Sequence, residues 1–157
     1  MDDIRLQPLS DADIPAAVDL LMHLNPTTPR EIIHQRLAEI LMNYPHYHLI
    51  GAFSGGTLLG LSGAWIATKV WCGKYLEIDN IVVHPDQRSG KIGTRLIEHL
   101  EILAREQQCE ILALDSYTSN YPSHRLYHRL GFEIRGFHFI KSLGEAVGSS
   151  RHPHPDQ

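Results

Sequence analysis

The sequence predicts an α/β fold in which helices flank a mixed sheet, and three observations lead to this prediction. The 157-residue chain is 43% hydrophobic and 20% charged, the composition of one globular domain with its own core. Two apolar runs surround a Ser-Gly-Gly turn within residues 47–67, which predicts an antiparallel hairpin. Residues 75–115 have the pattern of strand, helix and strand, which predicts a parallel, right-handed crossover.

The N-terminal residues predict a short strand and two helices. Ile4–Leu9 alternates as a strand does, and Ser10 begins a helix whose first turn is acidic. Asn25-Pro26 ends that helix. Thr28 then has the position of an N-cap, with proline next to it and Glu31 closing a capping box. A second amphipathic helix is therefore predicted to follow Thr28.

The centre of the chain predicts three successive strands. Tyr47–Phe53 and Thr57–Ala67 pair across the Ser-Gly-Gly turn, and Gly60 and Gly63 mark a bulge or a site of close packing. Tyr75–Val83 is the third strand. The remaining elements are predicted in the following order: an amphipathic helix from Ile92, a buried strand Glu110–Asp115, a helix Pro122–Leu130 ended by Gly131, and a final hairpin of Phe132–Ile134 and Phe137–Leu143. Gly144–Gln157 is predicted to be a disordered tail.

Charge and composition exclude several classes of function. The formal net charge of −4 argues against bulk nucleic-acid binding, and no apolar run is long enough to span a membrane. The first residues lack the apolar region of a signal peptide. Cys72 and Cys109 lie far apart, which fits a reducing cytoplasm. His-x-His pairs at 46–48 and 152–154 are weak metal signals, and no metal site is predicted from them.

The most informative stretch is Ile78–Gly93, in which an apolar strand leads through a basic, glycine-containing loop into a helix. Such a loop directs backbone N–H groups and the positive end of a helix dipole at one point, where phosphate can bind. It is not a P-loop, because Ile92 follows Gly90-Lys91 where serine or threonine is needed, and the Rossmann glycine pattern is incomplete. From the loop alone, phosphate binding and a plain strand-to-helix turn remain open.

Two motifs in this element order resemble the GNAT superfamily of acyl-CoA N-acyltransferases over Ile4–Leu143. The phosphate motif of that family, Arg/Gln-x-x-Gly-x-Gly/Ala, is matched at Arg88 and Gly93, whereas Lys91 stands where glycine is usual. The second family motif is matched at Asn120, Leu126, Tyr127, Arg129, Gly131 and Phe132, with Ser123 in place of alanine. The resemblance implies a mostly antiparallel sheet with one splayed parallel strand pair, and a single N-acetyltransferase domain in residues 1–143.

The resemblance also implies how acetyl-CoA, the co-substrate, would be held. The coenzyme A pyrophosphate would lie against the loop and first helical turn, formed by Arg88, Ser89, Gly90, Lys91, Ile92, Gly93 and Thr94. The pantetheine arm would enter the splay between Tyr75–Val83 and the strand at 111–115. It would meet the backbone of Ile81, Val82 and Val83, with Asn120 and Ser123 on its other side.

Acetyl transfer to an amine needs a base, an oxyanion donor and a proton for the thiolate. Glu77 is the candidate base, because the matching position is acidic in several family members. By strand alternation it is expected on the same strand face as Val83. Asp79 is a second carboxylate on that face, either catalytic or attracting a cationic substrate. Tyr127 is the candidate general acid by its motif position, and the amide of Val82 or Val83 the candidate oxyanion donor.

The acceptor is the least determined part of the prediction. Several short segments of the sequence resemble small bacterial acetyltransferases of aminoalkylphosphonates and other small amines. This resemblance favours a small primary amine as the acceptor, acetylated by direct attack in a ternary complex. A protein or peptide acceptor, and a non-catalytic coenzyme A-binding module, are the alternatives. The resemblance further implies a cytoplasmic homodimer, with no nucleic-acid or membrane partner.

Overall fold

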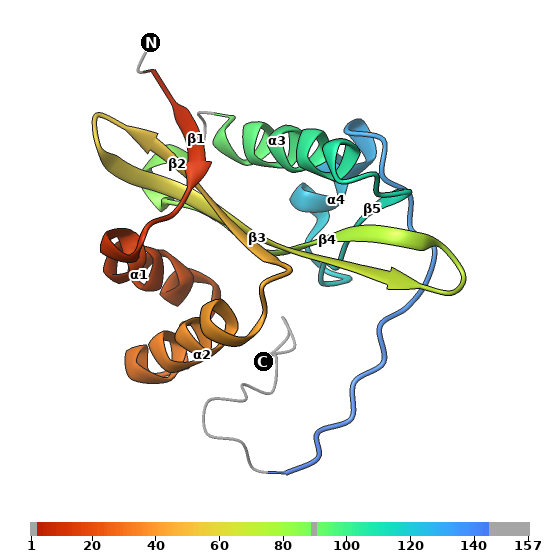
Figure 1. Cartoon of the computed structure of the whole chain (residues 1–157), viewed down its shortest axis with the longest axis horizontal. Helices are drawn as coiled ribbons and strands as arrows, with labels where there is room; N and C mark the ends of the chain where they lie inside the picture. Colours follow the sequence, from red (N-terminus) through yellow and green to blue (C-terminus); the bar gives the residue numbers. More distant parts are fainter. Residues whose placement is uncertain (1–2, 89–90, 145–157) are drawn as a thin grey trace.

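The computed structural model describes residues 3–88 and 91–144 and shows one five-stranded sheet with helices on both faces (Figure 1). The strands lie in the order β1-β2-β3-β4-β5, all antiparallel except the parallel pair β4–β5. The elements are β1 (Arg5–Pro8), α1 (Ile14–Leu24), α2 (Arg30–Asn43), β2 (Tyr47–Ser54), β3 (Thr57–Lys69), β4 (Gly73–Val83), α3 (Ile92–Glu106), β5 (Ile111–Leu114) and α4 (Tyr121–Arg129). The predicted mixed α/β sheet with one parallel pair is confirmed.

The sheet separates two apolar cores. On one face, α1 and α2 pack on the sheet around Val18, Leu37 and Leu61. On the other face, the amphipathic helix α3 packs on it through Leu96 and Leu100 (Figure 1). Each β4 side chain is therefore turned either toward α1 and α2 or toward α3, and this assignment governs the site described below.

The N-terminal helices begin with different caps. The backbone N–H of Ser10 donates to the Asp13 carboxylate at 2.8 Å, closing the expected cap over a short 3-10 turn before α1. The prediction for the second helix is wrong by one residue. Pro29 rather than Thr28 is the N-cap, because the Pro29 carbonyl accepts the first helical bonds, from the amides of Ile32 and Ile33.

The hairpin β2–β3 forms at the predicted turn. Gly55 and Gly56 have φ angles of 53° and 84°, the left-handed backbone that a two-residue hairpin turn requires. Gly63 meets the expectation of close packing, since a Cβ there would lie 1.8 Å from the hydroxyl oxygen of Tyr47. The absence of a side chain at Gly63 thus creates the space in which Tyr47 is buried.

The predicted final hairpin is wrong. No strand forms in the described residues after α4, and β5 is the edge of the described sheet. Gly131 ends α4 with φ 92°, and Phe132 still packs against the α3 core. The first predicted arm, Phe132–Ile134, is too short for a stable two-stranded ribbon without a sheet beside it. His138 instead pairs with Asp115 at 2.9 Å, so the chain passes the end of β5. Most of the predicted tail, residues 145–157, lies outside the described residues.

Candidate functional site

The parallel strands β4 and β5 pair over only four residues each. The register runs from Tyr75 opposite Ile111 to Ile78 opposite Leu114. β4 continues for five more residues to Val83, and within the described chain these have no partner on the β5 side. Backbone N–H and C=O groups beside the divergence therefore have no partner in the described sheet on this side. They belong to the segment Ile81–Val83, for which the family resemblance implies contacts with the pantetheine arm.

A bulge at Asn80 interrupts β4 at this divergence. Asn80 has φ 56°, and the pairing with β3 shifts by one residue between Gly63–Asp79 and Leu61–Val82. The extra residue reverses the alternation of side chains. Glu77 lies on the α1/α2 face beside Trp65, whereas Val83 packs with the α3 core. The expectation that Glu77 and Val83 share a face is therefore wrong, although Glu77 and Asp79 do share one.

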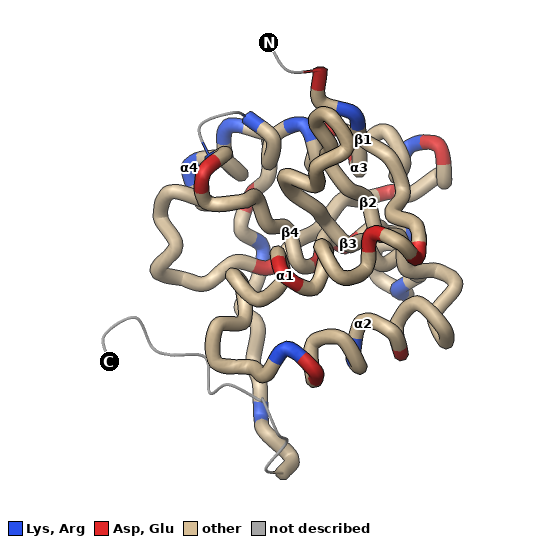
Figure 2. The backbone as a smooth tube through the Cα atoms, turned by 90° about the vertical axis from the view of Figure 1, so that its left-hand side faces the viewer, with Lys and Arg blue, Asp and Glu red and all other residues tan. Residues whose placement is uncertain are grey.

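The predicted phosphate loop leads directly into α3. A short 3-10 turn, Pro85–Gln87, follows β4, and Lys91 is the N-cap of α3 with a left-handed φ of 60°. The first amides of α3, from Ile92 to Thr94, have no partner within the helix. The basic residues Arg88 and Lys91 stand on either side of residues 89–90, at the start of α3 (Figure 2). Ser89 and Gly90, which the sequence also assigned to coenzyme A, lie outside the described residues.

Gly93 is not required by packing. A Cβ there would meet only Val83, at an ordinary contact distance of 3.8 Å. Glycine inside a helix costs about 1 kcal/mol relative to alanine, so its presence in the first turn calls for another reason. Open space in front of the first amides of α3 is such a reason, and it fits the close approach of a pyrophosphate.

Helix α4 supplies the second set of predicted residues. Asn120 is its N-cap, exposed, with a carbonyl that accepts from the amide of His124. Tyr127 packs against the α3 core, and burial raises the pKa of its hydroxyl. A hydrogen bond with Ser123 opposes that rise. Ser123, predicted to contact coenzyme A, thus lies against the candidate acid and favours its ionised form.

The opposite face of the sheet carries the predicted carboxylates among aromatic rings. Tyr47, Trp65, Glu77 and Ala113 form one row across strands β2 to β5. The indole N–H of Trp65 donates to the Asp79 carboxylate at 3.0 Å. The Trp65 ring also contacts Tyr47 and Tyr44, with centroids 4.6 and 5.5 Å apart. Asp79 is thereby held at a fixed place beside an aromatic wall.

Glu77 lies in an environment that favours its protonated form. Burial raises the pKa of the Glu77 carboxyl, and the charge of Asp115 raises it further. Asp79 adds to the rise, while Lys69 and His138 oppose it. A carboxylate with a raised pKa is a stronger base than an ordinary glutamate and stays deprotonated above that pKa. This is the property required of a group that removes a proton from an amine.

The Acetyltransferase (GNAT) family model matches residues 17–132, which include both faces of this site. The chain belongs to the GNAT family. It is an acetyl-CoA-dependent N-acetyltransferase.

Relatives of this GNAT acetyltransferase act on different acceptors. It is 31% identical over 132 residues to an IAA acetyltransferase of Azospirillum brasilense, covering 84% of each chain. It is 31% identical over 110 residues to an aminoalkylphosphonate N-acetyltransferase of Salmonella typhimurium, covering 68% of each. The aminoglycoside N-acetyltransferase AAC(6')-Iy, solved in complex with CoA, shares the fold with a TM-score of 0.80 at 19% identity, over 92% of this chain and 97% of that one.

Three residues of the site were not singled out from the sequence as site residues: Trp65, Asp115 and His138. Trp65 lies opposite Glu77 because the β3–β4 hairpin turns at residues 70–72. The sequence prediction ended β3 at Ala67 and began β4 at Tyr75, which are partners in the structure, but it did not pair the two strands residue by residue. Counting two residues along each strand from Ala67 and Tyr75 would have placed Trp65 opposite Glu77.

Metal and membrane features were also sought in the described residues. No group of three histidine, cysteine or acidic side chains lies close enough there to hold a metal ion. His152 and His154 lie outside that part of the chain. No helix among the described residues is long and apolar enough to cross a lipid bilayer.

Proposed function

We propose that this enzyme acetylates the primary amine of a small, positively charged molecule by direct attack on acetyl-CoA. The carboxylates of Glu77, Asp79 and Asp115, which adjoin the divergence of β4 and β5 on the α1/α2 face, carry this proposal. Such a face attracts an ammonium group and repels a phosphonate. The free cysteines Cys72 and Cys109 fit the cytoplasm as its compartment.

The residues at the divergence fit coenzyme A. Amides of Ile92, Gly93 and Thr94, with the cations of Arg88 and Lys91, would hold the pyrophosphate. The unpaired backbone of Ile81–Val83 would bind the pantetheine arm as an added strand, and Asn120 would contact it from α4. Ser89 and Gly90 complete the loop in this proposal.

The chemistry then divides between the two faces of the sheet. Glu77 takes a proton from the ammonium group of the acceptor, so that a neutral amine attacks the thioester carbonyl. The carbon–nitrogen bond forms, and the amide of Val82 or Val83 stabilises the oxyanion. The carbon–sulfur bond breaks, and the Tyr127 hydroxyl gives its proton to the leaving thiolate. The nitrogen loses its second proton as the amide forms, and that proton restores the Tyr127 hydroxyl through solvent. Asp79, oriented by Trp65, attracts the acceptor without exchanging a proton.

A panel of acceptors tests the proposal through thiol release from acetyl-CoA. Diamines and aminoglycosides represent cationic acceptors, aminoalkylphosphonates represent anionic ones, and peptide N-termini represent protein acceptors. We expect turnover to be greatest with a cationic small amine. A preference for aminoalkylphosphonates would contradict the role of the carboxylates. Saturable acetylation of peptides alone would establish a protein acceptor instead.

A further inference from the structure

The side chain of Tyr47 crosses the sheet from β2 toward β4. Tyr47 lies opposite Trp65 of β3, and the two rings pack with centroids 4.6 Å apart. The Tyr47 ring then passes over Gly63, where a Cβ would lie 1.8 Å from the hydroxyl oxygen. Gly63 is in turn opposite Asp79 of β4. The Tyr47 hydroxyl therefore extends toward β4 through the space that a side chain at residue 63 would fill.

The Tyr47 hydroxyl meets the bulge of β4. The side chain of Tyr47 is hydrogen bonded to that of Asn80, the residue with a left-handed φ of 56°. Asparagine tolerates this conformation better than most residues, because its side chain can bond to backbone groups close by in the sequence. Here the bond is to a side chain two strands away. It thus ties β2 to the bulge across β3.

Tyr47 is suited to hold a neighbour rather than to exchange a proton. Its side chain is buried, and burial raises the pKa of the hydroxyl well above the ordinary value of a tyrosine. The charge of Asp79 raises that pKa further, whereas the hydrogen bond with Asn80 opposes the rise. The hydroxyl therefore keeps its proton at neutral pH. It is a neutral hydrogen-bonding group in a fixed place, as a structural tie requires.

The sheet leaves this part of β4 unsupported. Pairing with β3 stops at Asp79 and resumes at Val82. Asn80 and Ile81 lie between these pairs and have no partner in the register. On the other side, pairing with β5 ends at Ile78 within the described sheet. A left-handed residue persists only when its surroundings hold it, so the bond from β2 supports the bulge where the sheet does not.

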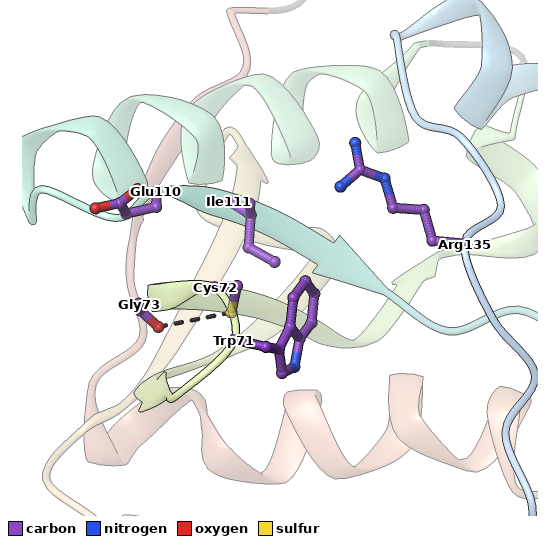
Figure 3. Close-up of a pocket in the computed structure, with 6 residues that line it drawn as sticks. All are labelled: Trp71, Cys72, Gly73, Glu110, Ile111 and Arg135. Atoms are coloured by element: carbon purple, nitrogen blue, oxygen red, sulfur yellow. Dashed lines mark hydrogen bonds between the residues drawn. The ribbon is translucent and has the colours of Figure 1, made fainter.

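The opposite end of β4 is supported differently. There the strand borders a hollow of about 370 Å³, lined by Trp71, Cys72, Gly73, Glu110, Ile111 and Arg135 (Figure 3). β4 is paired on both sides at this end, since Tyr75 lies opposite Ala67 of β3 and Ile111 of β5. Hydrogen bonds of the sheet thus fix the backbone there, although the surface beside it is open. A side-chain tie matters where this pairing is lost, at the bulge.

We propose that Tyr47 is a positioning residue, whose bond to Asn80 fixes the direction of the β4 backbone at residues 81–83. The tie itself does not depend on which amine is acetylated. Its effect on turnover rests on the proposed function, in which a backbone amide of this segment stabilises the oxyanion. Because the oxyanion exists only during the reaction, a loosened bulge should lower kcat more than it raises KM for acetyl-CoA.

Nuclear magnetic resonance of the backbone amides tests the tie without turnover. Tyr47→Phe removes the hydroxyl and keeps the ring against Trp65. We expect the amide resonances of residues 81–83 to shift in this variant, and Asn80→Ala to shift them in the same direction. In the Asn80→Ala protein, a further Tyr47→Phe change should add little, because both substitutions break the same bond. Resonances that do not move, or shifts of the two variants that simply add, would overturn the proposal.

Steady-state kinetics with the best acceptor of the panel measures the consequence for turnover. Tyr47→Phe should lower kcat about tenfold, less than the roughly 10²-fold loss expected when an oxyanion donor is removed outright. KM for acetyl-CoA should change little. Calorimetric titration with coenzyme A gives the fraction of binding-competent protein, so that unfolded enzyme is not counted as a loss of kcat.

Ser62→Ala is the matched control. It removes another buried hydroxyl close to the bulge, one that donates to the neighbouring carbonyl of Gly63 at 3.1 Å. Its kcat should stay near the value of the parent. An equal fall of kcat in both variants would overturn the specific role of Tyr47. An unchanged kcat in Tyr47→Phe with shifted amides would contradict the proposed oxyanion donor while supporting the tie, so the two failures are distinguishable.

Discussion

The two faces of β4 differ in chemistry although they belong to one strand. Toward α3, its side chains are apolar and continuous with a core that includes Leu96 and Leu100. Toward α1 and α2, Glu77 and Asp79 lie among aromatic rings beside a further carboxylate, Asp115. An apolar face gives packing, whereas a half-buried acidic face lowers stability unless it is paired or used. The difference is the one expected if the proposed chemistry takes place on the α1/α2 face.

The largest effect is expected on the acidic face. Glu77→Gln should lower kcat/KM at neutral pH by about 10²-fold, because the variant cannot take the proton of the ammonium group. Its pH–rate profile should move to higher pH, where the free amine is already deprotonated. Glu39→Gln, at an exposed position of α2, is the control. A profile unchanged by Glu77→Gln would remove Glu77 from the mechanism.

Glu77→Gln should also change the stability of the protein, and by an amount that depends on pH. The pKa of Glu77 is higher in the folded state than in the unfolded state. The protein therefore loses free energy of unfolding as the pH rises from the unfolded-state pKa through the folded-state pKa. Glu77→Gln should therefore be more stable than the parent at pH 7 and should approach it near pH 4. Thermal unfolding at the two pH values measures this difference. A variant that is less stable at pH 7 would contradict the unfavourable burial of charge.

A smaller effect is expected on the α3 face. Tyr127→Phe should lower kcat by about 10²-fold or less and leave coenzyme A affinity nearly unchanged, because only the proton for the thiolate is lost. Tyr121→Phe, an exposed position on the same helix, should have no effect. Steady-state kinetics with calorimetric titration of coenzyme A separates the two quantities. An unchanged kcat would leave Tyr127 with a packing role alone.

The link between Trp65 and Asp79 should affect binding more than turnover. Trp65→Phe replaces the indole with a smaller aromatic ring and removes the N–H that bonds the Asp79 carboxylate at 3.0 Å. Since a hydrogen bond to a charged group is worth about 1.5–3 kcal/mol, KM for the amine should rise about tenfold or more. The value of kcat should change less. Trp71→Phe, at the exposed hairpin tip, is the matched control.

The smallest effect is expected at the entrance to α3. Lys91 adopts a left-handed backbone, which costs about 1 kcal/mol for a residue with a side chain. Lys91→Gly should remove that strain and raise the melting temperature by a few degrees. Coenzyme A affinity should fall modestly with the lost charge. A lower melting temperature would show that the Lys91 side chain stabilises the loop in another way.

Local features of the fold were predictable from the sequence, and features assembled across strands were not. The Ser-Gly-Gly turn, the amphipathic α3 and the loop before it are each encoded by contiguous residues. The bulge at Asn80 was not predictable, because asparagine signals a bulge only weakly and one extra residue inverts every later position. The final hairpin was predicted from the apolar residues after α4, but those side chains are exposed in the structure and form no strand. Apolar residues alone do not determine which surface they pack against.

The bulge at Asn80 also divides β4 into two parts that can be altered independently. Residues before it contribute their odd-numbered side chains to the acidic face. Of the residues after it, Ile81 and Val83 pack with the α3 core and Val82 packs with the α1/α2 core, and all three are proposed coenzyme contacts. The hairpin residues 63–67 and 75–79 thus form one exchangeable module. If the proposed acceptor site is formed by this module, grafting it from another family member should transfer acceptor preference and leave coenzyme A binding unchanged.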